Sequence, residues 1–185
     1  SALMRVPDIS ADPGGRPEIP DRIIALALGG VLFLSTIYSY IPVFSAGFVN
    51  YDYNGYVVTN PMVNNGLSWK GGLAAFTTVR AANWHPLTWL SHAADVTVFG
   101  MNPAGHHAVN LFLHALNVLV LFSVLRRLTG ARFRSAAVAG LFALHPLHVE
   151  SVVWIAERKD VLCALFYLSA LLLHLRYARA PSLRR

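Results

Sequence analysis

The segment His145–Asp160 contains a high density of residues that can do chemistry: two histidines, three acids and two bases. It lies between two strongly apolar segments, and polar residues in that setting are typical of a loop or a site at a membrane surface. If the segment is helical, Glu150 and Glu157 share one face and Asp160 follows one turn later. The pattern indicates either a solvated hairpin between two helices or a carboxylate site at the surface.

The composition identifies the class of protein. The chain has 185 residues, of which 55% are hydrophobic and only 13% are charged, which indicates an integral membrane protein. The formal net charge of +6 comes from short basic clusters at the ends of apolar segments. Such clusters determine membrane topology, so we expect no nucleic-acid partner. The single cysteine, Cys163, excludes an intramolecular disulfide.

Four apolar segments predict the architecture. At 1.5 Å per residue, the first is long enough to cross a bilayer, and the third is short and rich in small residues. We therefore predict an all-α integral membrane protein with about four transmembrane helices and a long outward loop. The predicted parts are a polar tail over 1–22, spans at 23–44, 107–125, 133–147 and 161–175, the outward loop 45–106, and a basic tail over 178–185.

The outward loop carries signals for two short helices. One is predicted over Ser68–Val79, and the other begins at Pro86, a residue favoured in the first helical turn, and ends near Val98. Trp69, Trp84 and Trp89 are expected to lie in the headgroup layer.

The distribution of basic residues predicts the orientation. If both termini are cytoplasmic, eleven Lys and Arg residues lie inside and four lie outside, which agrees with the positive-inside rule. The outward loop and His145–Asp160 then face the same compartment and can meet there. In the third apolar segment, Ser135/Ala139 and Ala136/Gly140 are spaced for close helix approach, and we expect another subunit to dock on this face.

Several longer motifs resemble one family. They resemble the membrane portion of bacterial tetratricopeptide-repeat (TMTC-like) O-mannosyltransferases, which belong to the GT-C glycosyltransferases and use polyprenyl-phosphate sugars. The resemblance covers about residues 48–177. The motifs are Asn83-Trp-His-Pro-Leu-Thr-Trp-Leu-Ser-His, Phe99-Gly-Met-Asn-Pro-Ala-Gly-His-His, Val109-Asn-Leu-Phe-Leu-His-Ala-Leu-Asn, Leu141-Phe-Ala-Leu-His-Pro-Leu-His-Val-Glu-Ser and Ala156-Glu-Arg-Lys-Asp-Val-Leu.

The resemblance implies roles for individual residues. Asp52 matches the first acid of an acidic pair in the first outward loop, where it would act as base or metal ligand, with Glu150 and Asp160 as supporting acids. Arg158 or Lys159 would bind the lipid phosphate through charge-assisted hydrogen bonds. An active enzyme would need a polyprenyl-phosphate sugar and a divalent metal.

Two departures from the family favour a protein without catalysis. The second acid of the pair is Tyr53, and a phenol does not replace a carboxylate as base or hard-metal ligand. Family members usually have more spans and a repeat domain, so we expect a shortened and partly degenerate relative. The leading interpretation is a structural, non-catalytic subunit, without a cofactor, that contacts lipids and other membrane protein subunits. The alternative is an active glycosyltransferase.

The histidines leave a third interpretation open. His107 and His114 share a face of the second span, and His174 lies near the end of the fourth. Intramembrane histidines ligate haem iron or the magnesium of bacteriochlorophyll, so these three are candidate tetrapyrrole ligands. His145 and His148 alone do not define a metal site, and no metal site is predicted. The expected location is a bacterial inner membrane, cytoplasmic or intracytoplasmic.

Overall fold

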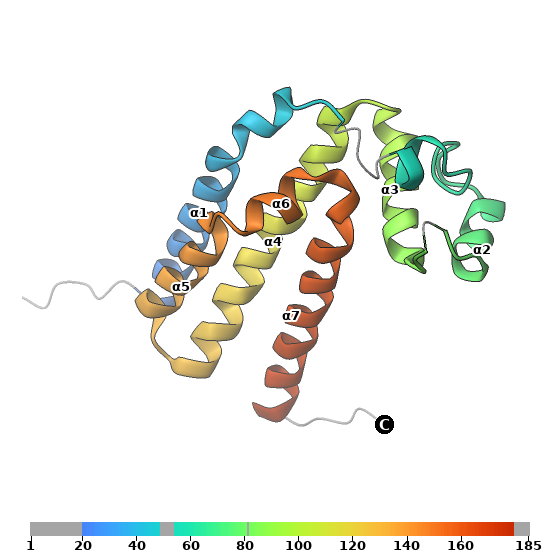
Figure 1. Cartoon of the computed structure of the whole chain (residues 1–185). Coiled ribbons are helices and arrows are strands. Elements are labelled where there is room, and N and C mark those ends of the chain that lie inside the picture. Colours follow the sequence, from blue (N-terminus) through green and yellow to red (C-terminus); the bar gives the residue numbers. More distant parts are fainter. Residues whose placement is uncertain (1–19, 49–53, 81, 180–185) are drawn as a thin grey trace, which may run out of the picture.

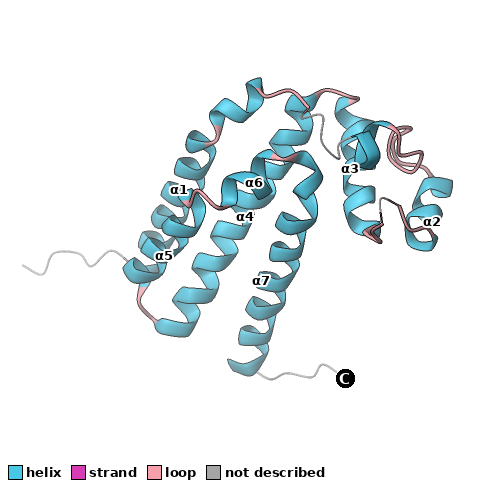
Figure 2. Ribbon diagram, viewed as in Figure 1, coloured by secondary structure: helices cyan, strands magenta, loops and turns pink. Residues whose placement is uncertain are grey.

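The computed structural model describes residues 20–48, 54–80 and 82–179 (Figure 1). Within these ranges the secondary structure is helical, and the one β contact is an isolated bridge between Arg80 and Asn83 (Figure 2). The elements are α1 (Asp21–Ser39), the 3-10 helix η1 (Ile41–Ser45), the π-helix η2 (Asn54–Val58), α2 (Trp69–Thr77), α3 (Pro86–Phe99), α4 (Pro103–Thr129), α5 (Arg132–Leu144), α6 (His148–Val153), the 3-10 helix η3 (Ile155–Glu157) and α7 (Arg158–Arg179).

Helix α4 is the centre of the molecule. It lies between α7 on one side and the α1–α5 pair on the other, and it contacts all three (Figure 1). One apolar cluster joins α1, α4 and α5; its buried members are Leu32, Val118, Phe122, Ala139 and Ala143. A second joins η1, α4, α6 and α7. Burial of these side chains holds α1, α4, α5 and α7 together as one bundle.

The protein is an all-α membrane protein. Three described helical stretches are long and apolar enough to cross a membrane, namely Asp21–Ser45, Pro103–Thr129 and Ile155–Arg179. Helix α5 has only 13 residues, which corresponds to about 20 Å of helix against a hydrocarbon core of about 30 Å. That α5 also spans the bilayer, as a fourth crossing, stays a prediction.

The small-residue face of α5 is partly covered from within the chain. Ser135 and Ala139 are buried, and a Cβ atom placed on Gly140 would lie 3.6 Å from Leu32 Cδ2 of α1. The small side chains allow α1 and α4 to approach closely. Part of this face is therefore used inside the chain, and docking of another subunit on the rest of it stays a prediction.

One end of the bundle is rich in arginine. Asp21 at the start of α1 pairs with Arg126 at 2.9 Å and with Arg132 at 2.7 Å, so the ends of α1, α4 and α5 are tied together. Arg176 and Arg179 lie in the last turn of α7, at the same end (Figure 1). The positive-inside rule would place this end in the cytoplasm, and that orientation stays a prediction.

The opposite end carries η2, α2, α3, α6 and η3. Both short helices predicted for the long loop are confirmed: α2 follows Ser68, whose Oγ accepts a hydrogen bond from Gly71 N at 3.0 Å, and α3 begins at Pro86. Trp89 is buried in a local apolar core, whereas Trp69 and Trp84 are exposed. That these elements lie in the headgroup layer stays a prediction.

The connection between α3 and α4 is tight. Gly100 ends α3 with a positive φ of 61°, and the Asn102 side chain caps α4 by accepting a hydrogen bond from Ala104 N at 3.1 Å. Gly105 lies so close to Phe99 that a Cβ atom would overlap the ring. This short turn places the first residues of α4 directly beside the face of α3 that carries the polar residues described next.

Candidate functional site

A buried polar cluster joins α3, α4 and α7 around Arg158. The Arg158 side chain is fully buried, and its guanidinium pairs with Asp95 Oδ2 at 2.6 Å. It also donates hydrogen bonds to Ser91 Oγ and the His106 carbonyl oxygen, each at 2.9 Å, and to Asn110 Oδ1. A buried ion pair is tolerated when hydrogen bonds satisfy the remaining donors, and the neighbours of Arg158 supply them.

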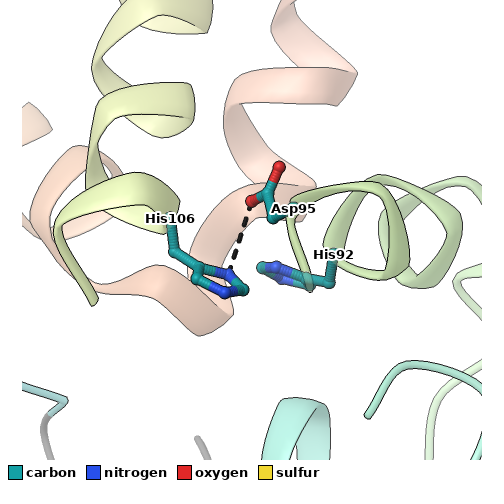
Figure 3. Close-up of side chains that lie close together, drawn as sticks. All are labelled: His92, Asp95 and His106. Carbon is teal, nitrogen blue, oxygen red and sulfur yellow. Dashed lines mark ion pairs between the residues drawn. The ribbon is translucent and has the colours of Figure 1, made fainter. Parts of the chain in front are cut away.

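Two histidines, His92 and His106, lie beside Asp95 of this ion pair (Figure 3). His92 and Asp95 are three residues apart on α3 and share a face, and His106 is in the first turn of α4. All three residues are buried, and one potential ligand atom from each lies within 4.8 Å of the others. His106 Nδ1 is 3.4 Å from Asp95 Oδ2. Imidazole and carboxylate are ligand types that divalent transition metals favour.

Burial determines the charge of the two α3 residues. The pKa of His92 is held well below its usual range, first by burial and then by the charge of Arg158, so its ring is neutral. Burial raises the pKa of the Asp95 carboxyl, and the neighbouring Arg158 guanidinium opposes that rise. The guanidinium is thus the group that favours an ionised Asp95 in this interior.

A second feature is an apolar groove between the start of α3 and the first turns of α7. Its volume is about 590 Å³. The α7 residues that line it recur on one helical stripe, starting with Lys159 at the polar end and reaching Phe166 two turns further along. The complete lining is Phe76, Trp84, His85, Pro86, Leu87, Thr88, Lys159, Asp160, Leu162, Cys163 and Phe166.

The polar end of this groove is lined by charges of both signs, Lys159 and Asp160. Lys159 Nζ lies 2.6 Å from Glu157 Oε1 and above the ring of Tyr56, with 5.7 Å to its centroid. His85 Nε2 is buried and has no hydrogen-bond partner within the described structure. Burial, followed by the charge of Lys159, lowers the pKa of His85. Residues from the first turns of both α3 and α7 line the groove.

The predicted acidic residues differ in their position relative to the groove. Asp52 and Tyr53 lie outside the described residues. Glu150 is exposed on α6, and Asp160, in the first turn of α7, accepts a hydrogen bond from Ser151 Oγ at 3.0 Å. Asp160 lines the groove next to Lys159, so the structure brings these two predicted site residues together.

Of the two residues expected to bind phosphate, only Lys159 is placed to do so. Lys159 faces the groove, but Arg158 points into the protein and its donors are engaged by Asp95, Ser91, His106 and Asn110. A ligand at the surface therefore meets Lys159 and does not meet Arg158.

The three candidate tetrapyrrole ligands do not come together. His107 and His114 are buried in the interior of the bundle, where His114 Nε2 lies 3.1 Å from the Ala143 carbonyl oxygen. His174 is exposed near the opposite, arginine-rich end of α7. A flat macrocycle at His107 or His114 would have to displace side chains that pack α4 against its neighbours.

Asp95 and His92 are site residues that the sequence motifs did not indicate. Asp95 itself was a usable signal, because it is the single acid in an otherwise uncharged helix and such an acid needs a partner when it is buried. Asn110 was missed as well, although its amide also donates to the Val152 carbonyl oxygen at 3.2 Å and so joins α4 to α6.

Comparison with known proteins gives the family relationship. The chain is 32% identical over 158 residues to protein O-mannosyl-transferase Tmtc1 of Drosophila melanogaster, a match covering 82% of this chain and 18% of that protein. It is 37% identical over 131 residues to protein O-mannosyl-transferase TMTC1 of Mus musculus, with 65% and 14% covered. Its relatives are protein O-mannosyl-transferases. Protein O-mannosyl-transferase TMTC4 of Homo sapiens is 37% identical over 118 residues, with 56% and 16% covered.

The chain spans less than a fifth of the length of these protein O-mannosyl-transferases. No family model and no solved structure matches it. The resemblance read from the sequence motifs is thereby confirmed at the level of homology to O-mannosyl-transferases, all of these named examples being animal proteins. A bacterial source and a shortening of this chain relative to its family stay predictions.

Proposed function

We propose that the chain is part of a glycosyltransferase that uses a polyprenyl-phosphate sugar, and that the groove between α3 and α7 holds this donor. The homology to protein O-mannosyl-transferases carries the proposal and favours it over a non-catalytic role. The groove offers such a donor an apolar channel for an isoprenoid tail and, at its polar end, the ammonium group of Lys159 for a phosphate.

The polar end offers a phosphate two donors. Lys159 supplies a positive charge, which it now shares with Glu157, and His85 Nε2 can donate a hydrogen bond that it does not make within the described protein. The tail would follow Leu162 and Phe166 along α7, toward the lipid-facing middle of the helix. This orientation keeps the phosphate at the membrane surface and the isoprenoid in the bilayer.

Transfer would then require a base beside the phosphate. A carboxylate takes the proton from the acceptor hydroxyl, the hydroxyl oxygen attacks the anomeric carbon, and the sugar–phosphate bond breaks as the lipid phosphate leaves. Asp160 lines the groove and Glu150 lies on the adjacent α6, so both can support this step, with Asp52 as the principal base. A divalent metal would assist by neutralising charge on the phosphate.

Donor binding tests the proposal directly. The chain in detergent is titrated with a polyprenyl phosphate, and the fluorescence of Trp84 in the groove reports binding. Lys159→Ala should weaken binding about ten- to a hundredfold, the loss expected for one charge-assisted hydrogen bond. Lys70→Ala on the exposed surface of α2 is the matched control and should bind as the unaltered chain does. Equal affinity in both variants would contradict the placement of the donor.

A non-catalytic subunit role is the second candidate, and the observation that favours it is Tyr53 in place of the second acid. The two functions are separated by Asp52→Asn in cells that depend on this chain. Loss of glycosylated product supports the transferase. Unchanged glycosylation, together with co-purification of the chain with other membrane proteins, supports the subunit role and contradicts the transferase.

A further inference from the structure

The contact between His106 and Asp95 places lone pairs face to face. His106 Nε2 lies 3.2 Å from the Gly100 carbonyl oxygen, and His106 Nδ1 lies 3.4 Å from Asp95 Oδ2. Both neighbours are acceptors, whereas a neutral imidazole carries only one N–H. In either tautomer, one ring nitrogen therefore presents a lone pair to another lone pair. A positive charge between the groups, either a second proton or a cation, removes this repulsion.

His92 adds a second unsatisfied group at the same place. Its ring is completely buried, neither ring nitrogen has a hydrogen-bond partner within the described structure, and its centroid lies 6.0 Å from that of His106 (Figure 3). Burying an imidazole without partners is unfavourable by a few kcal/mol. A second proton on His106 would relieve the contact with Asp95 and leave His92 as it is. A metal cation relieves the contact with Asp95 and also engages one of the two unpaired His92 nitrogens.

We propose that His92, Asp95 and His106 bind a divalent transition-metal cation, with Zn²⁺ as the best fit, and that this ion fastens α3 to α4. Two imidazoles and one carboxylate are a common ligand set for Zn²⁺ at about 2.0–2.2 Å, with water in the fourth position. The Gly100 carbonyl accepts from His106 Nε2–H, which leaves Nδ1 as the ligand atom. The ligand atoms, now within 4.8 Å of one another, move inward when the ion binds.

Arg158 limits the strength of this site. Its guanidinium contacts the same Asp95 oxygen at 2.6 Å and is held in place by Ser91 and the His106 carbonyl, so it does not swing away. Its positive charge opposes the ion, while its hydrogen bonds fix the carboxylate in the position that the ion needs. The ion must approach from the His92 side, and we expect binding weaker than in a site without a neighbouring cation.

An ion that joins α3 to α4 would also affect the groove. The α3 segment is the part of the outer layer that carries one wall of the donor groove, whereas α4 is the centre of the bundle. An ion shared by α3 and α4 would hold that wall in position. The site itself lies apart from the groove, since none of its three ligands lines it.

The test measures metal content and thermal stability of the full chain in mild detergent, without any transferase assay. The chain is stripped with a chelator, dialysed against Zn²⁺ and analysed by plasma mass spectrometry, and its melting temperature is recorded with and without Zn²⁺. His92→Gln removes one neutral ligand and leaves the Arg158–Asp95 pair intact. His174→Gln, at the exposed end of α7, is the matched control.

We expect about one Zn²⁺ per chain and a Zn²⁺-dependent rise in melting temperature for the unaltered chain and for His174→Gln. In His92→Gln both should be lost. The proposal is overturned if the stripped chain binds no Zn²⁺, Co²⁺ or Mn²⁺, or if His92→Gln binds as much metal as the control. Because His92→Gln lies outside the groove, failure here leaves polyprenyl phosphate binding at Lys159 untouched, so the two proposals fail separately.

Discussion

Both ends of the helical bundle contain aspartate–arginine pairs, but their environments differ. At the arginine-rich end, Asp21 is 60% exposed and its partners Arg126 and Arg132 are 30% and 34% exposed. At the other end, Asp95 is 5% exposed and Arg158 is fully buried. Water and salt screen the first pair, whereas the second depends on protein groups for its solvation. The same two residue types therefore form a screened surface pair at one end and an interior site at the other.

Replacing Arg158 should give the largest loss of stability at either end of the bundle. Arg158→Met leaves Asp95 buried without its partner and should lower the free energy of unfolding by roughly 3–5 kcal/mol. Chemical unfolding in detergent measures the loss, and Arg126→Met, at the exposed end, is the control with little expected change. The double variant Arg158→Met/Asp95→Leu should recover most of the stability. A double variant as unstable as the single one would show that the pair itself, and not the stranded charge, accounts for the loss.

The tight turn between α3 and α4 should give the next largest loss of stability when it is altered. Gly105→Ala should cost about 1–3 kcal/mol, because the added methyl group overlaps the Phe99 ring and shifts the connection that places His106 beside Asp95. Gly30→Ala is the matched control, since a Cβ atom there meets nothing within 4 Å and alanine favours a helix. The melting temperatures of the two variants should move in opposite directions, and equal shifts would contradict the packing argument.

Acid should lower the stability of the end that carries α3, through His85. Burial and Lys159 lower the pKa of His85 below the usual 6.5, so the unfolded chain takes up a proton more readily than the folded chain. The stabilising contribution is complete above pH 6.5 and is lost as the pH falls through the lower folded pKa. Solvent screening reduces the effect to a few tenths of a kcal/mol. Melting curves between pH 7.5 and 5 should show a shallower decline for His85→Gln than for His174→Gln.

The smallest effect is expected at the exposed end. Asp21→Asn removes a screened pair, so the melting temperature should change within the error of replicate measurements, and added salt should abolish any difference. A large destabilisation by this variant would show that the two ends do not differ in the way their exposure indicates.

The helices could be predicted from the sequence because their signals are local. Apolar segments of sufficient length predict α1, α4 and α7, while Ser68 and Pro86 mark the starts of α2 and α3. The groove was predictable only in part: Lys159 and Asp160 were named, but the facing wall from His85 to Thr88 depends on how α3 packs against α7.

The buried cluster could not be predicted by such signals. Arg158 lies in a charged segment that reads as solvated, and only tertiary packing turns it inward. Its partners on α3 and α4 are far away in the sequence, so neither helical periodicity nor spacing links them. The small-residue face of α5 shows the same limit, because spacing predicts close approach without identifying the helix that approaches.

The order of synthesis gives the buried pair a further importance. Arg158 follows Ser91 by 67 positions and His106 by 52, so the ribosome makes α3 and α4 well before the residue that neutralises Asp95. At about 5–20 residues per second, the carboxylate waits for several seconds beside the membrane without its arginine. We expect α3 to remain in water during that interval, because docking onto α4 would bury the carboxylate without its arginine. Arg158 would thus delay the docking of α3 onto α4 until α7 has been synthesised.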